Sequence, residues 1–561
     1  MSPDSPAAGG SPTRTIRDLA DAHVAAHARL DPLLATSLGL PGGEDRLPDL
    51  SPAGEEALAE LEGRTLAALN SALNPALNSA DRPAEGHERR CARLLRERLD
   101  ASAATRAAGE SLRDVQILFG PVQGMRTVLT LMPTETPEQR EAVGGRLARI
   151  PEAYEGYVAS LREGLRRGLV AASRQVDAVV AQFDSWLAAD WFTGFAAAAG
   201  ADGRPATAAL AGLREFLASE YRPRAEGVPD GVGEERYRIA VRRWTGSDLD
   251  PHEAYAWAWT EFHRILDEQR AETVRILPGA TPREAMAHLD ARGEAVDGVE
   301  AIRERLQRIT EEAIAALQGT HVDLAPELLR VESMIAPEGS AAAPYYTQPS
   351  LDFSRPGRTW LPTLGRSRFP MWDLVSTWYH EGVPGHHLQL GQWVLCAGEL
   401  STFQSGAGMI SANLEGWALY AERLMDELGF LTDPGHRMGY LDAQMMRAIR
   451  VIIDIGMHLE LEVPPDSPYA PGSRWTPELA RGFFGAYCGR DPAFLDSELL
   501  RYLGGPAQAI SYKLGERAWL AGRDAARTRR GKDFDLKTWH MAALSQGSLG
   551  LDDLESELAA L

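Results

Sequence analysis

The sequence is organised around one stretch, Tyr379-His380-Glu381-Gly382-Val383-Pro384-Gly385-His386-His387-Leu388-Gln389. It holds three of the thirteen histidines in the chain, with a glutamate and a Gly/Pro/Gly set between them. In the zinc motif H-E-x-x-H, two histidines four residues apart share one face of a helix, and the glutamate is a general base. Here the next histidine follows six or seven residues after His380, so the plain motif is absent.

The helix geometry decides whether these histidines can share a metal. On an unbroken helix, the sixth residue after His380 points about 120° away and lies about 9 Å further along. The seventh faces the right way but lies about 10.5 Å further along, too far for two zinc–nitrogen bonds of about 2.0–2.1 Å. Either the helix is distorted here, or the stretch does not chelate a metal.

Glycine and proline between the histidines favour a distortion. Pro384 has no amide hydrogen to donate to the carbonyl of His380, four residues back, and its ring crowds that carbonyl. Gly382 and Gly385 allow the backbone excursion that a bulge or a break requires. A two-residue bulge would return His386 to the position of the second histidine in H-E-x-x-H. We therefore expect a metal site at this stretch.

Composition limits the classes of partner. The 561 residues carry a net charge of −21, which argues against a nucleic acid or an anionic membrane as partner. Three widely separated cysteines, Cys91, Cys396 and Cys488, favour a reducing compartment over a disulfide framework. The N-terminus lacks the features of a signal peptide, and no run of about eighteen apolar residues could span a membrane. We therefore expect a cytoplasmic protein.

Apolar residues recur at helical spacing through most of the chain. After a Pro/Gly/Ser-rich tail, residues 1–13, which we expect to be disordered, the helical pattern begins at Ile16. It continues over residues 55–73, 84–108, 137–171, 173–199, 206–222, 251–275, 282–289 and 297–318. Length alone would allow two to four domains.

The pattern changes between residues 325 and 370. Leu329–Ile335 partly alternates between apolar and polar residues and could be a strand, while Leu351–Thr363 is poor helix material. We expect one small β-element with loops, directly before the helix that carries His380. Its edge could bind an extended peptide by strand addition, or the segment could be an ordinary structural loop.

Two further helices carry candidate polar groups. Ser411–Leu428 is amphipathic and places Glu415 and Glu422 seven residues apart on one face, although most carboxylates on such a helix are simply solvated. Gly416 allows another element to come close. Leu441–Leu461 is apolar nearly all round, which is typical of a buried helix. Its exceptions recur at three- and four-residue spacing, and they are Arg447, Arg450, Asp454 and His458.

Buried polar groups need partners, so these four residues allow two hypotheses. They could form a second layer that orients a metal-bound imidazole. They could equally form an internal salt-bridge network without a catalytic role. Near the C-terminus, Gly504–Gly515 opens another helix, and there Tyr512 and Lys513 are candidates for stabilising an oxyanion or holding a substrate carboxylate.

Three stretches together resemble the DUF885 family, a bacterial family related to zinc metallopeptidases. They are His380–Gln389, Glu415–Glu422 and Pro506–Gly515, and they occur in the order found in that family. The resemblance spans most of the chain from about residue 15. The family looks like a variant of the all-helical gluzincin peptidases, which include the neurolysin-like and carboxypeptidase Taq-like enzymes.

The resemblance implies a mainly α fold: one elongated helical domain over residues 14–561 with a deep cleft and the small β-element near the active site. Residues 14–325 would form an N-terminal helical half and residues 326–561 a catalytic half. The related enzymes carry H-E-x-G-H and a downstream glutamate. Matching Gly-His to Gly385-His386 implies one Zn²⁺ ion held by His380, His386 and Glu415, with His387 as the alternative to His386.

The implied mechanism is metal-assisted hydrolysis. Three ligands leave a position for water, Glu381 would act as the general base, and Tyr512 would help to hold the oxyanion. Glu422, Arg450, Asp454 and His458 would surround the ligands. Arg355, Arg358 or Lys513 could bind the C-terminal carboxylate of a short peptide, which makes a carboxypeptidase or dipeptidase our main hypothesis, although these cations could also be surface charges.

Two alternatives remain at this level. One is a zinc hydrolase that acts on a non-peptide amide or ester. The other is a non-catalytic binding protein of the same fold, against which Glu381 argues, because a binding protein has no need of a base.

Overall fold

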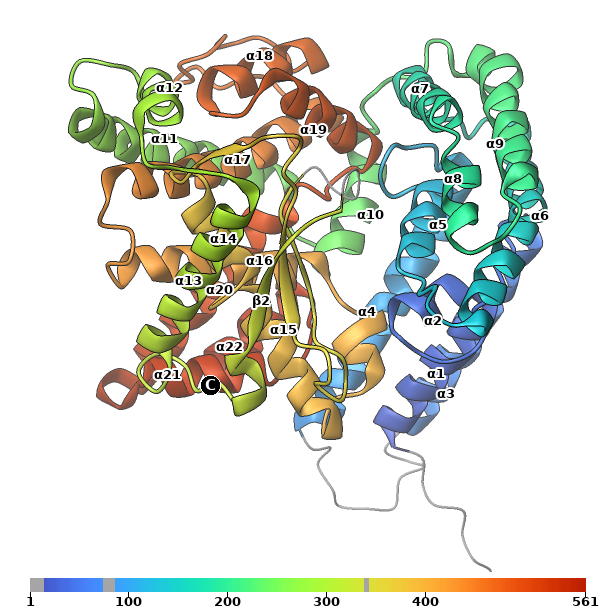
Figure 1. The fold of residues 1–561 in the computed structure, drawn as a ribbon, viewed down its shortest axis with the longest axis horizontal. Helices are drawn as coiled ribbons and strands as arrows, with labels where there is room; N and C mark the ends of the chain where they lie inside the picture. The colour runs from blue at the N-terminus through green and yellow to red at the C-terminus, as the bar shows by residue number, and fades with distance from the viewer. Residues whose placement is uncertain (1–14, 74–85, 338–342) are drawn as a thin grey trace, which may run out of the picture.

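Helices make up most of the computed structural model, which describes residues 15–73, 86–337 and 343–561 (Figure 1). This confirms the predicted mainly α fold, whereas the tail predicted at residues 1–13 lies outside the described residues. The first helices are α1 (Ile16–Leu30), α2 (Pro32–Ser37), α3 (Pro52–Ala72), α4 (Gly86–Ala107), α5 (Pro121–Thr130), α6 (Pro137–Arg167), α7 (Ser173–Ala188), α8 (Trp191–Ala198), α9 (Arg204–Phe216), α10 (Gly233–Thr245), α11 (Pro251–Ile276), α12 (Pro282–Arg292) and α13 (Val299–Leu317).

The second series of helices follows the strands of the β-element. It consists of α14 (Leu374–Glu381), α15 (His386–Leu395), α16 (Ser411–Glu427), α17 (Pro434–Leu459), α18 (Pro477–Tyr487), α19 (Pro492–Gly504), α20 (Ser511–Arg530), α21 (Leu536–Leu544) and α22 (Leu551–Ala560). Among the helices of the described residues, none is long and apolar enough to cross a bilayer.

The described residues form two large hydrophobic cores and a small third cluster of Ala285, Met286, Leu289, Trp372 and Met438. Helices α5 to α9, which belong to one large core, lie at one end of the longest axis of the molecule (Figure 1). The smaller of the two large cores is built from residues 115–225 and includes helices α5 to α9. The larger core runs from Ile16 in α1 to Leu558 in α22 and takes side chains from both sides of residue 325. The N-terminal and catalytic halves defined from the sequence therefore share one core.

The helix that carries the first histidine breaks where glycine and proline predicted a distortion. α14 ends at Glu381 and α15 begins at His386, so residues 382–385 connect two separate helices. The Val383–Pro384 peptide bond is cis. A Cβ atom on Gly385 would lie 1.9 Å from the carbonyl oxygen of His380, so only glycine fits there. The indole of Trp417 in α16 donates to the carbonyls of Pro384 (3.0 Å) and Gly385 (3.1 Å), which fixes the connection against α16.

The β-element precedes α14, as the sequence indicated. Strands β2 (Val331–Ile335), β4 (Gly357–Leu361) and β3 (Tyr345–Thr347) form a sheet in that order, with β2 parallel and β3 antiparallel to β4. A second, two-stranded sheet pairs β1 (Ala295–Asp297) with β5 (Arg368–Pro370). The indole of Trp378 in α14 donates to the hydroxyl of Ser333 in β2 at 3.2 Å, so the larger sheet is tied to the helix that carries His380.

Helices α16 and α20 cross at two glycines. A Cβ on Gly416 would lie 2.4 Å from the carbonyl carbon of Gly515, and a Cβ on Gly515 would lie 2.0 Å from the carbonyl oxygen of Ala412. This contact confirms the expectation that another element approaches Gly416, and it brings the start of α20 next to Glu415.

Candidate metal centre

Three side chains of the predicted ligand set meet at one point. The Nε2 atom of His380 lies 3.3 Å from Oε2 of Glu415, and Nε2 of His386 lies 3.7 Å from the same oxygen. One ligand atom from each residue lies within 4.8 Å of the other two. His380 comes from the last turn of α14, His386 is the first residue of α15, and Glu415 is on α16. The helix break therefore compensates for the six-residue spacing.

The donor set fits a divalent metal. Oε2 of Glu415 is buried and, apart from Nε2 of His380 at 3.3 Å and Nε2 of His386 at 3.7 Å, has no partner within the described residues, so the oxygen keeps a lone pair for an ion. Two imidazole nitrogens and one carboxylate are the ligands of catalytic zinc sites, which keep a further position open. These three residues would hold the ion.

The electrostatics of the cluster also favour a cation. Although burial opposes it, the imidazoles of His380 and His386 hold the pKa of Glu415 well below its usual range. Burial lowers the pKa of His380, but hydrogen bonds to Glu415 and Glu422 outweigh it and raise that pKa to about 9. Without a metal, a proton on His380 therefore balances the carboxylates, and a bound metal would replace that proton.

Glu422 orients the first imidazole. Its Oε1 atom lies 2.8 Å from Nδ1 of His380, and the hydroxyl of Ser376 donates to its Oε2 atom at 2.5 Å. Glu422 is fully buried, and burial would raise its pKa, but the nearby charge of Arg447 and the contact with His380 lower it. A carboxylate on the far nitrogen of a ligand histidine fixes the tautomer and points the other nitrogen at the metal.

His387 lies outside the cluster. Its Nδ1 atom is 2.9 Å from the hydroxyl of Tyr346, and its Nε2 atom is 2.9 Å from the carbonyl oxygen of Leu328. Burial lowers the pKa of His387 to about 4, so the ring is neutral, donates to Leu328 and accepts from Tyr346. The structure thus brings together His386 and not His387, which instead ties α15 to β3.

Two candidate catalytic groups border the three ligands. Glu381 is the last residue of α14 and is buried, and burial raises the pKa of its carboxyl group, while the nearby His380 and His386 oppose the rise. Tyr512 is the second residue of α20. Burial and the negative charge of Glu415 raise the pKa of the Tyr512 hydroxyl. The charges of the ligands therefore affect the pKa of both groups, which indicates that both groups lie near the ligands.

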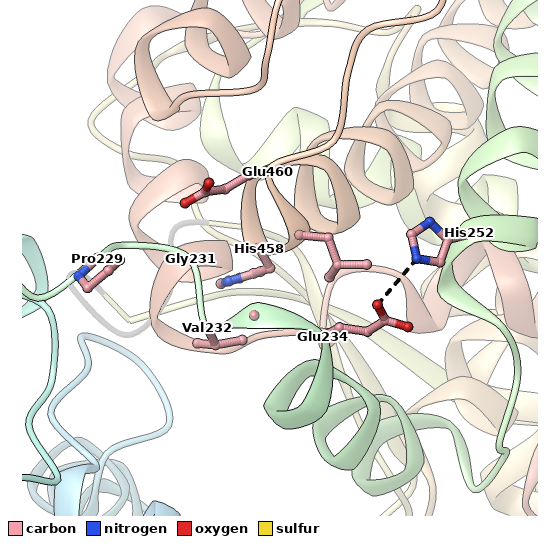
Figure 2. Close-up of a pocket in the computed structure, with 9 residues that line it drawn as sticks. Pro229, Gly231, Val232, Glu234, His252, His458 and Glu460 are labelled. Carbon is pink, nitrogen blue, oxygen red and sulfur yellow. Dashed lines mark ion pairs between the residues drawn. The ribbon is translucent and has the colours of Figure 1, made fainter.

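The other residues expected around the ligands make their hydrogen bonds to groups other than the ligands. Arg450 donates to Glu498 at 2.6 Å, and Asp454 accepts from the hydroxyl of Tyr237 at 2.6 Å. His458 lies 3.1 Å from the carbonyl oxygen of Tyr502 and lines a separate pocket of about 420 Å³ (Figure 2). Of the four residues, only Glu422 contacts a ligand imidazole, and the polar groups of the other three meet Glu498, Tyr237 and Tyr502.

Of the three proposed substrate-binding cations, the prediction is wrong for Lys513. Its ammonium group is fully buried and pairs with Glu261 at 2.8 Å and Glu516 at 2.5 Å, so it belongs to an internal ion-pair network. Arg358 pairs with Glu332 at 2.9 Å. Arg355 is half-buried, lies near Tyr346 and makes no ion pair within the described residues.

Sequence reasoning missed Ser376 and Tyr346. Ser376 lies four residues before His380, so both share one face of α14, and this spacing could have identified it. Tyr346 is distant from His387 in the sequence, and its contact depends on the position of the sheet, for which no local pattern exists. The predicted deep cleft stays a prediction, because neither the pocket in Figure 2 nor a pocket of about 470 Å³ beside α4 and α10 is lined by the ligands.

Comparisons with known proteins place the chain in a family. The family described as "Bacterial protein of unknown function (DUF885)" matches residues 32–558, so the chain belongs to this family. No curated protein matches the sequence. A solved structure from Colwellia psychrerythraea, called a lipoprotein, has 21% identity and a TM-score of 0.79, covering 97% of this chain and 98% of that one. Another from Shewanella oneidensis, called a lipoprotein of unknown function, has 18% identity and a TM-score of 0.72, covering 97% and 99%. At these identities the likeness shows the fold alone.

Proposed function

We propose that this member of the DUF885 family is a zinc-dependent hydrolase that cleaves amide bonds in short peptides, as a carboxypeptidase or a dipeptidase. The observation that carries the proposal is the meeting of His380, His386 and Glu415, with the ligand atoms within 4.8 Å of one another and Glu381 beside them. Three ligands and a neighbouring carboxylate are what metal-assisted hydrolysis requires.

The chain's own groups would divide the work as follows. When bound, zinc would supply a Lewis acid that lowers the pKa of a ligated water to about 7. Glu381 would take a proton from the attacking water and pass it to the leaving amine. Its raised pKa suits this double role, because a base must also release its proton within the same cycle. Tyr512 would donate a hydrogen bond to the oxygen that becomes negative during attack.

The β-element supports a peptide as substrate. β3 pairs with β4 on one side only within the described residues, so its other edge has backbone groups free for strand addition. The contact between Tyr346 and His387 holds β3 next to α15, whose first residue is His386. Of the three predicted cations, Arg355 makes no ion pair within the described residues, whereas Arg358 and Lys513 do. Its guanidinium would therefore be free to bind a substrate carboxylate.

The test combines metal analysis with turnover. The purified protein should contain one zinc ion and should hydrolyse members of a mixed peptide library, with loss of activity in a chelator. Glu381→Gln should abolish turnover and keep the zinc, because the residue is a base and not a ligand. The matched control is Glu327→Gln, an exposed position that should leave both properties unchanged.

Three results would contradict the proposal. Turnover by Glu381→Gln would exclude Glu381 as the general base. Activity that survives complete removal of zinc would exclude a role of the metal in hydrolysis. Hydrolysis of acylated amino acids without hydrolysis of any peptide would support the non-peptide alternative instead.

A further inference from the structure

The ring of Tyr512 rests on a buried arginine. The guanidinium carbon of Arg450 lies 4.8 Å from the centre of the Tyr512 ring, within the range of a cation–π contact. Arg450 is 5% exposed, and such contacts strengthen when the cation is removed from water. The hydroxyl of Tyr512 makes no hydrogen bond within the described residues, so no polar partner fixes the side chain and the contact of its ring with Arg450 bears directly on its orientation.

Arg450 is itself held rigidly. It donates to Oε2 of Glu498 at 2.6 Å and to the hydroxyl of Tyr502 at 2.8 Å, and that hydroxyl donates to the same carboxylate at 2.5 Å. Arg501 donates to Glu498 at 2.7 Å as well. The guanidinium plane is therefore fixed from α19, while the arginine is on α17 and the tyrosine is on α20.

The backbone alone does not determine where the Tyr512 hydroxyl points. The close contact between Gly416 and Gly515 fixes the distance between α16 and α20, and thus between the backbones of Glu415 and Tyr512. A tyrosine near the start of a helix still has rotatable side-chain bonds, and several staggered rotamers compete. A planar cation against one face of the ring selects among them.

We propose that Arg450, held by Glu498 and Tyr502, is a positioning residue that keeps the Tyr512 hydroxyl directed at the metal centre. The catalytic part of this inference rests on the proposed hydrolase function. The orientation of Tyr512 is a property of the folded chain and can be measured without any substrate. The arginine thus acts through the tyrosine and touches neither the ion nor the substrate.

The competing explanation is that Arg450 only stabilises the core. A control separates the two explanations, because Arg523 is also a buried arginine that faces a tyrosine ring and pairs with a glutamate, and it additionally donates to the hydroxyl of Tyr420 at 3.3 Å. It is 6% exposed, pairs with Glu427 at 2.8 Å and lies 5.2 Å from the ring of Tyr420, which is not at the metal centre. If Arg450 only stabilises the core, Arg450→Met and Arg523→Met should have similar effects on the orientation of Tyr512 and on turnover.

The first experiment uses 3-fluorotyrosine at position 512 alone, followed by ¹⁹F NMR of the full-length protein. We expect one narrow resonance in the parent and in Arg523→Met, and a shifted or broadened resonance in Arg450→Met. Should Arg450→Met fail to fold, Arg450→Lys is measured instead. It keeps the charge beside Glu498 but loses the planar group that stacks on the ring, so the resonance should change as well. An unchanged resonance in a folded Arg450 variant overturns the proposal.

The second experiment is a double-mutant cycle on turnover. Tyr512→Phe should lower kcat by about 10²-fold, the effect of removing one oxyanion donor, and Arg450→Met by about tenfold with little change in KM. In the Tyr512→Phe background, Arg450→Met should have no further effect, because its action passes through the hydroxyl. Full additivity would overturn the positioning role. If the parent hydrolyses nothing, the proposed function fails, while the fluorine resonance still decides on the orientation of Tyr512.

Discussion

Substitution of Gly416 by alanine tests whether the contact between α16 and α20 sets the geometry of the metal centre. The new Cβ would lie 2.4 Å from the carbonyl carbon of Gly515, whereas an ordinary contact is 3.4–4 Å. The two helices would have to separate by about 1 Å, because the obstacle is backbone in a close-packed interior and cannot rotate away. We expect overpacking to cost up to about 3 kcal/mol, offset by about 1 kcal/mol from the better helix propensity of alanine.

The net expectation is a loss of about 2 kcal/mol in the free energy of unfolding, measured by urea denaturation. Gly63 in α3 is the control, since a Cβ there meets nothing within 4 Å, and Gly63→Ala should gain up to about 1 kcal/mol. Turnover should also fall by about 10²-fold, because a shift of about 1 Å between Glu415 and Tyr512 misplaces the reacting groups. If Gly416→Ala is as stable as Gly63→Ala, the close contact is not a constraint and this reasoning is refuted.

Three further predictions concern the ligands and their neighbours. Glu422→Gln should weaken zinc binding by about 10- to 100-fold in competition with a chromophoric chelator, because the ring of His380 loses its orienting carboxylate; an unchanged affinity would exclude that role. His387→Phe should keep one zinc by metal analysis but lose about 1–3 kcal/mol of stability, because buried groups of Leu328 and Tyr346 lose their partner; loss of the metal would contradict our choice of His386. In the metal-free protein the pKa of His380 is raised to about 9, above the value of 6.5 for an ordinary histidine. The stability that this imidazole contributes should therefore be complete below pH 6.5 and lost as the pH rises to 9; urea denaturation at these pH values should show the loss, and His380→Gln should abolish it.

The sequence predicted the cluster of His380, His386 and Glu415 because most of its chemistry is local. His380, Glu381 and His386 lie within one short stretch, and the effect of Pro384 on the carbonyl of His380 follows from backbone chemistry alone. The predicted distortion is present as a complete break between α14 and α15. Most helices were likewise visible from apolar spacing, and so was β2, because both periodicities are properties of neighbouring residues.

The partners of the buried polar groups could not be predicted in the same way. Arg450, Asp454 and His458 recur on one face of α17, and the spacing showed that they need partners, but it could not show which. The structure gives each a partner from a distant segment, such as Glu498 for Arg450 and Tyr237 for Asp454. The role of Lys513 could not be predicted for the same reason. Whether a lysine faces a substrate or a buried carboxylate depends on tertiary packing, and the position of Lys513 beside Tyr512 in the sequence gives no information about that packing.

Compared with H-E-x-x-H, the stretch holds two more residues, and their position would explain how a metal site could tolerate them. The insertion lies after Glu381, so His380 and Glu381 remain consecutive residues of one helix and keep the relative direction that they have in H-E-x-x-H. Only the second histidine is displaced, and a new helix that begins at His386 can be placed as a unit. Two contacts anchor this helix. The indole of Trp417 in α16 donates to the connecting loop, and His387 contacts Tyr346 of β3 and the carbonyl of Leu328. An insertion between the first histidine and the base would instead change the angle between ligand and base, which no later element could restore.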